Sequence, residues 1–143
     1  MIIDNEWYKN RILWKAKKNY LFNYNCIKYD DLKSSHKNCI QKLIDKTEVP
    51  VIVFFENCNK WTLLCTNKLY SYYDDVLQCV DKDNFNQKIT PHIDINSEPI
   101  SHNLAKKDAK WLKMNETGEY IWLPSSDDLW NFWGLLQMLA KLR

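Results

Sequence analysis

The chain has 143 residues, of which 45% are hydrophobic and 14% aromatic, and its formal net charge is +2 at pH 7. A chain of this length and composition is expected to fold as one domain with a sizeable core, which excludes an intrinsically disordered protein. The near balance of acidic and basic residues predicts no strong non-specific attraction to nucleic acid or to an anionic membrane.

The start of the chain carries Asp4, Glu6, Lys9 and Arg11, and this mixture of charges is unlike a secretory signal. The longest unbroken apolar run, Val49–Phe55, is much shorter than a stretch that crosses a bilayer. We therefore expect a cytoplasmic protein with no membrane partner.

Glycine occurs only at positions 118 and 134. Walker A loops, dinucleotide-binding fingerprints and the nucleophile elbow of hydrolases need several closely spaced glycines, because the backbone there turns sharply or approaches a phosphate. The sequence therefore excludes these three kinds of site. Hairpin turns must instead use Asn and Asp, which tolerate left-handed backbone conformations.

The cysteines are odd in number and form no Cys-x-x-Cys pair. This pattern predicts five reduced, buried thiols and no bound metal. A disulfide framework or a zinc site is the alternative, and only the spacing of His36 and Cys39 supports zinc. The five residues are Cys26, Cys39, Cys58, Cys65 and Cys79.

Residues 5–22 are predicted to form a helix, and we expect its aromatic side to pack on the rest of the domain. An aromatic and basic helix can alternatively bind nucleic acid or a membrane surface. Residues 23–34 read as a polar connector, and a second helix is expected from Ser34 or Ser35 to about Lys46. The two stripes of the first helix are Trp7, Arg11, Trp14 and Lys18, and Tyr8, Ile12, Ala16 and Tyr20.

From Val51 onward the pattern changes from helical spacing to short extended runs rich in β-branched and aromatic residues. Short polar connections between the first four runs predict an antiparallel meander. A later hairpin is expected to turn at residues 115–118. The predicted strands cover residues 51–56, 61–66, 69–73, 76–80, 92–95, 109–114 and 119–123.

The last segment is predicted to be a long amphipathic helix over residues 126–142 that packs on the sheet. A serine at position 125 or 126 supplies its N-cap, and Asp127 and Asp128 lie in the first turn, where the helix dipole favours negative charge. The side chains expected to face the sheet core are Trp133 and Leu136.

The predicted fold class is α+β, with antiparallel strands, two N-terminal helices and one long C-terminal helix. Residues 1–143 are expected to form a single domain. Its helical part covers residues 1–48, and the sheet with the last helix covers residues 49–143.

The order of elements over residues 50–143 resembles a pleckstrin-homology-like domain. The resemblance is carried by Trp61–Thr66, by the hairpin at Asp74–Asp75 and by the segment Gly118–Leu142. It implies antiparallel strands in a split barrel or bent sheet, with the C-terminal helix plugging one open end. It also implies similarity to small bacterial proteins of the immunity or interaction type, and it carries over no functional residues.

No residue pattern identifies a catalytic, cofactor-binding or metal site. His36, His92 and His102 stand among polar residues and are interpreted as surface or turn histidines. A small-molecule-binding protein, or an enzyme whose site is assembled from dispersed residues, stays open as the alternative. It would need a polar pocket with His92 or His102 beside a carboxylate or a cysteine.

The favoured interpretation is a non-enzymatic protein-binding module, and its narrower form is an immunity or inhibitor protein that neutralises a basic partner such as a toxin. Seven tryptophans and eight tyrosines exceed what a small core hides easily, and aromatic side chains dominate binding energy at protein interfaces. Adjacent aspartates would attract a basic partner. The predicted partner-binding residues are Tyr72, Tyr73, Asp74, Asp75 and Trp130.

Overall fold

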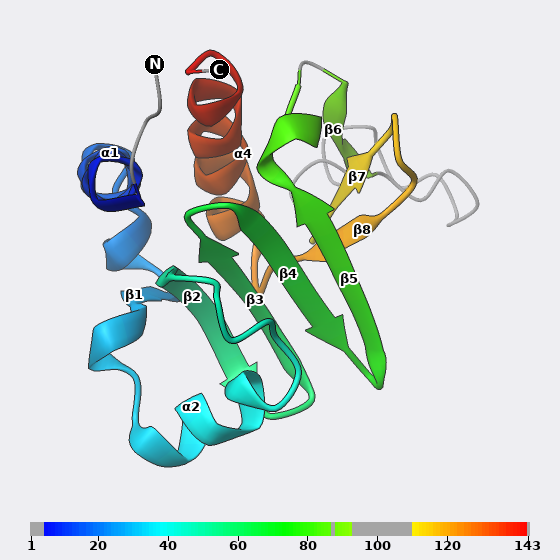
Figure 1. Ribbon diagram of the computed structural model, residues 1–143. Helices are drawn as coiled ribbons and strands as arrows, with labels where there is room; N and C mark the ends of the chain where they lie inside the picture. The colour runs from blue at the N-terminus through cyan, green and yellow to red at the C-terminus, as the bar shows by residue number, and fades with distance from the viewer. Residues whose placement is uncertain (1–4, 87, 93–109, 143) are drawn as a thin grey trace.

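The computed structural model describes residues 5–86, 88–92 and 110–142, which form an α+β fold with two antiparallel sheets (Figure 1). The predicted fold class, with two N-terminal helices and one long C-terminal helix, is confirmed at this level. The α-helices are α1 (Asn5–Lys18), α2 (Ser34–Gln41) and α4 (Ser126–Ala140), and the 3₁₀ turns are η1 (Leu21–Asn23), η2 (Tyr29–Asp31) and η3 (Lys82–Asn84).

The larger sheet has five strands in the order β1-β2-β3-β4-β5, and every neighbouring pair is antiparallel. Its last four strands are the predicted meander. β1 was not predicted, because it is three residues long and only Cys26 in it is buried. The strands are β1 (Cys26–Lys28), β2 (Pro50–Asn57), β3 (Lys60–Cys65), β4 (Lys68–Tyr73) and β5 (Val76–Asp81).

The smaller sheet has three strands in the order β6-β7-β8. These are β6 (Ile89–His92), β7 (Trp111–Met114) and β8 (Tyr120–Trp122). The predicted strand at residues 92–95 therefore begins earlier, and the rest of that range lies outside the described residues. The predicted hairpin turn is confirmed, since Gly118 has a φ of 94° and its N–H donates to the Met114 carbonyl over 2.6 Å.

The five-stranded sheet is covered on both faces. Helices α1 and α4 lie side by side over one face (Figure 1). Helix α2 packs on the other face, at the end of the domain away from α1 and α4. The core between α1, α4 and both sheets includes Phe54, Leu64, Leu112 and Phe132. On the other face a second cluster holds Ile40, Val53, Trp61, Leu63 and Tyr70.

Helix α1 buries only one of its two predicted stripes. Tyr8, Ile12 and Ala16 are buried, as an amphipathic helix requires. Trp7 and Trp14 remain 41% and 48% exposed, so the expectation that the aromatic side packs on the domain is wrong for these two rings. Trp7 and Trp14 instead contact the Arg11 guanidinium, which lies 5.8 Å and 4.7 Å from the two ring centres.

Helix α2 ends at Gln41, five residues before the predicted end at Lys46. Residues 45–47 form a local turn instead, in which the Asp45 carboxylate accepts hydrogen bonds from the backbone N–H and the hydroxyl of Thr47 at 3.0 Å and 2.9 Å. Such side-chain bonds to the backbone compete with helical hydrogen bonds.

Helix α4 is anchored by a side chain in its first turn. Ser125 is its N-cap, and the fully buried Asp128 accepts hydrogen bonds from the backbone N–H and the side-chain amide of Asn25 at 3.0 Å and 2.7 Å. Asp128 thus ties α4 to the residue before β1. Leu136 is buried as predicted, whereas Trp133 is half-buried and donates from Nε1 to the Ile89 carbonyl over 2.7 Å.

One pair of cysteines contradicts the prediction of five reduced thiols. Cys39 on α2 and Cys58 in the β2–β3 turn form a disulfide, with their Cα atoms 5.9 Å apart. They are separated by 19 residues, and only the packing of α2 beside this turn brings them together. Cys26 and Cys65 are buried free thiols, and burial raises the pKa of each well above its usual range.

Replacing Asp128 with Ala should lower the free energy of unfolding by about 2–4 kcal/mol, because it removes several hydrogen bonds to a buried charged group. Asp127 is the matched control, since it is the exposed neighbour in the same helical turn. Asp127→Ala should cost only about 0.3–1 kcal/mol through the helix dipole. Urea unfolding followed by circular dichroism measures both values, and equal losses would contradict the anchoring role of Asp128.

Thiol titration in denaturant without reductant should find three free thiols, and the same titration after reduction should find five. In the folded protein only Cys79, the exposed free thiol, should be alkylated quickly, because the other two thiols are buried and protonated. Mass spectrometry of alkylated peptides identifies the sites. Five reactive thiols in unreduced, unfolded protein would show that Cys39 and Cys58 are not bonded.

Candidate functional site: an aromatic groove between the sheets

Strand β8 is fastened across β3 and β4 by a ring of three hydrogen bonds. Thr62 on β3 donates its hydroxyl to the Trp122 carbonyl, and the Trp122 N–H donates to the Ser71 hydroxyl over 2.9 Å. Because the single Thr62 proton is already used, Ser71 donates to the Thr62 oxygen over 2.9 Å. All three residues are buried, so this inter-sheet clasp fixes the three-stranded sheet against the five-stranded one.

The three-stranded sheet turns one face toward α4 and the other toward the β4–β5 hairpin. Leu112 and Ile121 are cross-strand neighbours buried against α4. Because successive side chains of a strand point to opposite faces, the residues next to these along each strand face the hairpin. This row is His92 on β6, Trp111 on β7 and Trp122 on β8.

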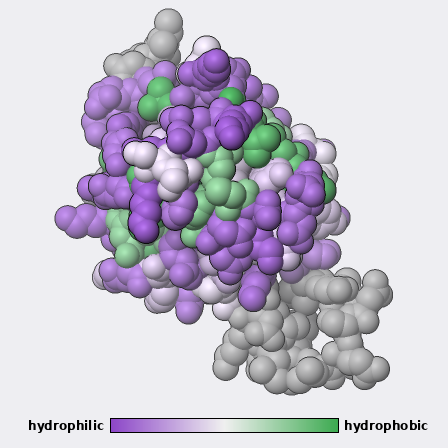
Figure 2. All heavy atoms as spheres, turned by 90° about the horizontal axis from the view of Figure 1, so that it is seen from below, coloured by the Kyte–Doolittle hydropathy of each residue, from purple (hydrophilic) through white to green (hydrophobic). Residues whose placement is uncertain are grey.

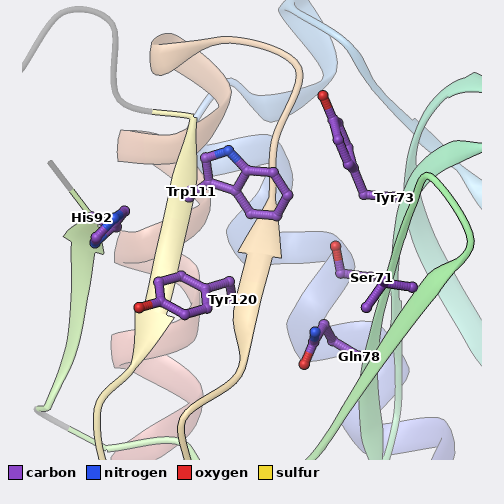
Figure 3. Close-up of a pocket in the computed structure, with 7 residues that line it drawn as sticks. Ser71, Tyr73, Gln78, His92, Trp111 and Tyr120 are labelled. Carbon is purple, nitrogen blue, oxygen red and sulfur yellow. The ribbon is translucent and has the colours of Figure 1, made fainter. Parts of the chain in front are cut away.

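A groove of about 570 Å³ lies between this aromatic row and the β4–β5 hairpin. Ser71 and Gln78 are a cross-strand pair on the hairpin side, and Tyr73 and Val76 are the next such pair on the same face. Figure 3 shows Trp111 and Tyr120 on the opposite side of the gap from Tyr73, Ser71 and Gln78. The lining residues are Ser71, Tyr73, Val76, Gln78, His92, Trp111 and Tyr120.

Ring contacts hold the walls of the groove in place. The Tyr73 ring centre lies 5.0 Å from that of Trp111 in an edge-on arrangement, and the His92 ring meets Tyr120 edge-on at 5.1 Å. Such contacts each add about 0.5–1.5 kcal/mol beyond the burial of area. Two ammonium groups lie over the tyrosine rings, Lys60 over Tyr73 at 5.1 Å and Lys113 over Tyr120 at 5.7 Å.

The chemistry of the groove is that of an apolar binding surface. Aromatic rings supply most of its wall, and the Ser71 hydroxyl is already engaged in the inter-sheet clasp. Among the described lining residues none is a carboxylate or a cysteine, so His92 has no such partner within the lining. His102, the other histidine considered for a pocket, lies outside the described residues.

Of the predicted partner-binding residues, Tyr73 lines the groove and Asp74 and Asp75 form the exposed turn beside it. Both aspartates have positive φ, 46° and 71°, which fits a two-residue hairpin turn. Figure 2, seen from this end of the molecule, shows a largely hydrophilic surface with apolar residues near its middle.

The other two predicted residues point elsewhere. Tyr72 lies on the opposite face of β4, where its ring stacks on Trp61 with the centres 5.6 Å apart. Its hydroxyl donates to the Asp75 carboxylate over 3.1 Å, and partial burial together with this carboxylate raises the pKa of Tyr72. Trp130 is 37% exposed on α4, away from the hairpin, and its ring contacts Trp133.

Sequence reasoning did not identify the remaining lining residues as a site. Val76 and Gln78 join the groove because β5 pairs with β4, and Tyr120 joins it because β8 packs across β3 and β4. The available signal was the hairpin register, since the predicted turn at Asp74–Asp75 already places Val76 opposite Tyr73.

Three further points bear on function, namely metal ligands, membrane-spanning helices and similarity to known proteins. Within the parts of the chain that the structure describes, no three or more His, Cys, Asp or Glu side chains gather as metal ligands would. None of the described helices combines the length and apolar character needed to cross a bilayer. No protein-family model, curated protein or solved structure matches the chain.

The inter-sheet clasp can be tested with Thr62→Val, which keeps the shape of the side chain and removes the hydroxyl. The variant should lose about 1–3 kcal/mol of unfolding free energy, because it leaves a buried carbonyl without its donor. Thr90→Val, at an exposed position of β6, is the control; its hydroxyl accepts only a solvent-exposed hydrogen bond from the Asn115 amide, so stability should change by less than about 0.5 kcal/mol. Thermal unfolding of both variants measures the difference, and the absence of one would rule out an energetic role for the clasp.

Proposed function

We propose that this protein is a non-enzymatic protein-binding module whose binding surface is the aromatic groove together with the acidic β4–β5 turn. The observation that carries the proposal is the open groove of about 570 Å³ walled by Tyr73, Trp111 and Tyr120. Buried aromatic anchors supply most of the binding energy at protein interfaces, and a preformed pocket for a partner's side chain is where they act.

The charge beside the groove indicates the kind of partner. Asp74 and Asp75 are exposed at the tip of the hairpin, and a carboxylate pair of this kind attracts a basic surface and speeds association. A basic protein such as a toxin fits this description. In that narrower form of the proposal, the chain is an immunity or inhibitor protein that works by occupying its partner.

A pleckstrin-homology-like arrangement is the finer form of the fold proposal. It is supported by the order of elements, in which the meander β2–β5 is followed by the three strands β6–β8 and then by α4. Helix α4 packs on β6 and β7. In this interpretation α1, β1 and α2 precede the shared fold and are additions to it.

A small-molecule-binding protein is the second candidate, and the size of the groove favours it. Ligand pockets in proteins span about 300–1,000 Å³ and are lined mainly by apolar side chains with a few polar groups. The groove falls in this range and carries the polar groups of Gln78 and His92. Its open form and the absence of a carboxylate or cysteine from the described lining favour a macromolecular partner over turnover of a substrate.

The test of function is affinity capture from the native host with three immobilised proteins, namely wild type, Tyr120→Ala and Tyr24→Ala. Tyr120 lines the groove, whereas Tyr24 is an exposed tyrosine outside it. A partner that uses the groove should be captured by wild type and Tyr24→Ala and lost with Tyr120→Ala. Binding of a small apolar molecule in a thermal-shift screen, with no captured protein, would favour the second candidate instead.

The role of the acidic turn can be measured with the double variant Asp74→Asn and Asp75→Asn. Asparagine removes both charges and still tolerates positive φ, so the turn should keep its shape. Association with a captured basic partner should slow several-fold at low salt and less at physiological salt, with dissociation little changed. Asp127→Asn removes an exposed carboxylate on α4 and is the control; an equal effect from it would point to net charge rather than to the turn.

A further inference from the structure

Strand β5 has an open edge. It is the last strand of the five-stranded sheet, and among the described residues it pairs only with β4. In an antiparallel ladder every second residue exchanges backbone hydrogen bonds with its partner. The two-residue turn makes Tyr73–Val76 and Ser71–Gln78 such pairs, and the bond from Lys82 N–H to the Asn67 carbonyl, 3.0 Å long, continues the same alternation.

It follows that the backbone N–H and C=O groups of Leu77 and Cys79 point away from β4. Natural proteins usually protect such an edge with lysine, proline or a bulge. Here Val76 and Leu77 are 55% and 37% exposed, Cys79 is also exposed, and the strand carries neither lysine nor proline. Among the described residues the edge is therefore an unprotected template for another strand.

The open edge also borders the groove. Val76 and Gln78 on β5 line it, so a strand added to β5 would point every second side chain toward the same aromatic face. The residue of the added strand that lies opposite Gln78 would be next to His92 and Tyr120 across the groove. Backbone bonds and one side-chain anchor would thus be made together, as in other cases of strand addition.

We propose that the partner binds by adding an extended segment to the free edge of β5 and inserting one apolar or aromatic side chain into the groove; this inference rests on the proposed function. The charges around β5 favour basic residues beside that side chain. Negative charge is concentrated at the turn, in Asp74 and Asp75, because Asp81 at the far end has Lys68 as its cross-strand neighbour and Lys82 next to it in sequence. Lys60 and Lys113 lie over tyrosine rings of the groove wall and not along the edge.

The experiment is a selection of random dodecapeptides displayed on phage against the full chain. Enriched peptides should share an apolar or aromatic residue with lysine or arginine close to it. Synthetic copies are then measured by isothermal titration against Cys79→Pro and Cys79→Ala. Proline removes the outward N–H without removing a bond to β4, and alanine keeps that N–H, so the pair isolates the backbone contribution.

Affinity for the selected peptides should fall at least about tenfold with Cys79→Pro and less than about twofold with Cys79→Ala. Circular dichroism reports whether the proline variant remains folded. Should the proline variant unfold, the selected peptides are instead N-methylated, either at odd-numbered or at even-numbered residues. Only the set whose N–H groups point toward β5 should lose affinity.

The two hypotheses fail differently. Peptides that lose affinity with Tyr120→Ala but bind equally well to Cys79→Pro would leave the groove as the binding site and overturn strand addition. A selection that enriches no peptide, or only peptides that bind Tyr120→Ala and Cys79→Pro as well as wild type, also overturns strand addition. If affinity capture still finds a partner that is lost with Tyr120→Ala, the proposed function stands without strand addition. If no such partner is captured, the proposed function is rejected as well.

Discussion

The inter-sheet clasp of Thr62, Ser71 and Trp122 is the constraint on which the candidate site depends. A short strand such as β8 has few backbone partners of its own, and the clasp satisfies both the N–H and the C=O of Trp122 from the neighbouring sheet. A closed ring of hydrogen bonds in a buried place permits one relative position of the two sheets. The distance between Trp111 and Tyr73, and hence the width of the groove, follows from that position.

A second polar contact, between Asp128 and Asn25, fixes helix α4, which packs on the face of the three-stranded sheet away from the groove. The buried carboxylate of Asp128 takes its hydrogen bonds from Asn25, which precedes the edge strand β1. The first turn of the last helix is therefore joined to the opposite edge of the larger sheet from the groove. The apolar contacts of α4 then bury Leu112 and Ile121, and this leaves the alternate residues of the same strands to form the aromatic row.

Much of this architecture is readable from local pattern, and the parts that are not depend on contacts between distant residues. The meander, the turn at Asp74–Asp75 and α4 carry their own periodicity and turn chemistry, so they could be predicted. Strand β1 is too short to show a period, and the Cys39–Cys58 bond needs α2 to pack beside a particular turn. The candidate site was predicted in part for the same reason: Tyr73 and the aspartates belong to one hairpin, whereas Trp111 and Tyr120 reach it through tertiary packing.

The β4–β5 hairpin carries aromatic contacts on both of its faces. Tyr72 stacks on Trp61 on one side, and Tyr73 meets Trp111 on the other. Successive residues of a strand point to opposite faces, so Tyr72 ties β4 to its cross-strand neighbour Trp61 within the sheet, and Tyr73 ties it to the three-stranded sheet. In the proposed mode of binding, a partner segment added to β5 loses its own freedom but does not have to order the strand that receives it. Such preorganisation lowers the entropic cost of association and allows a short segment with a single anchor to bind specifically.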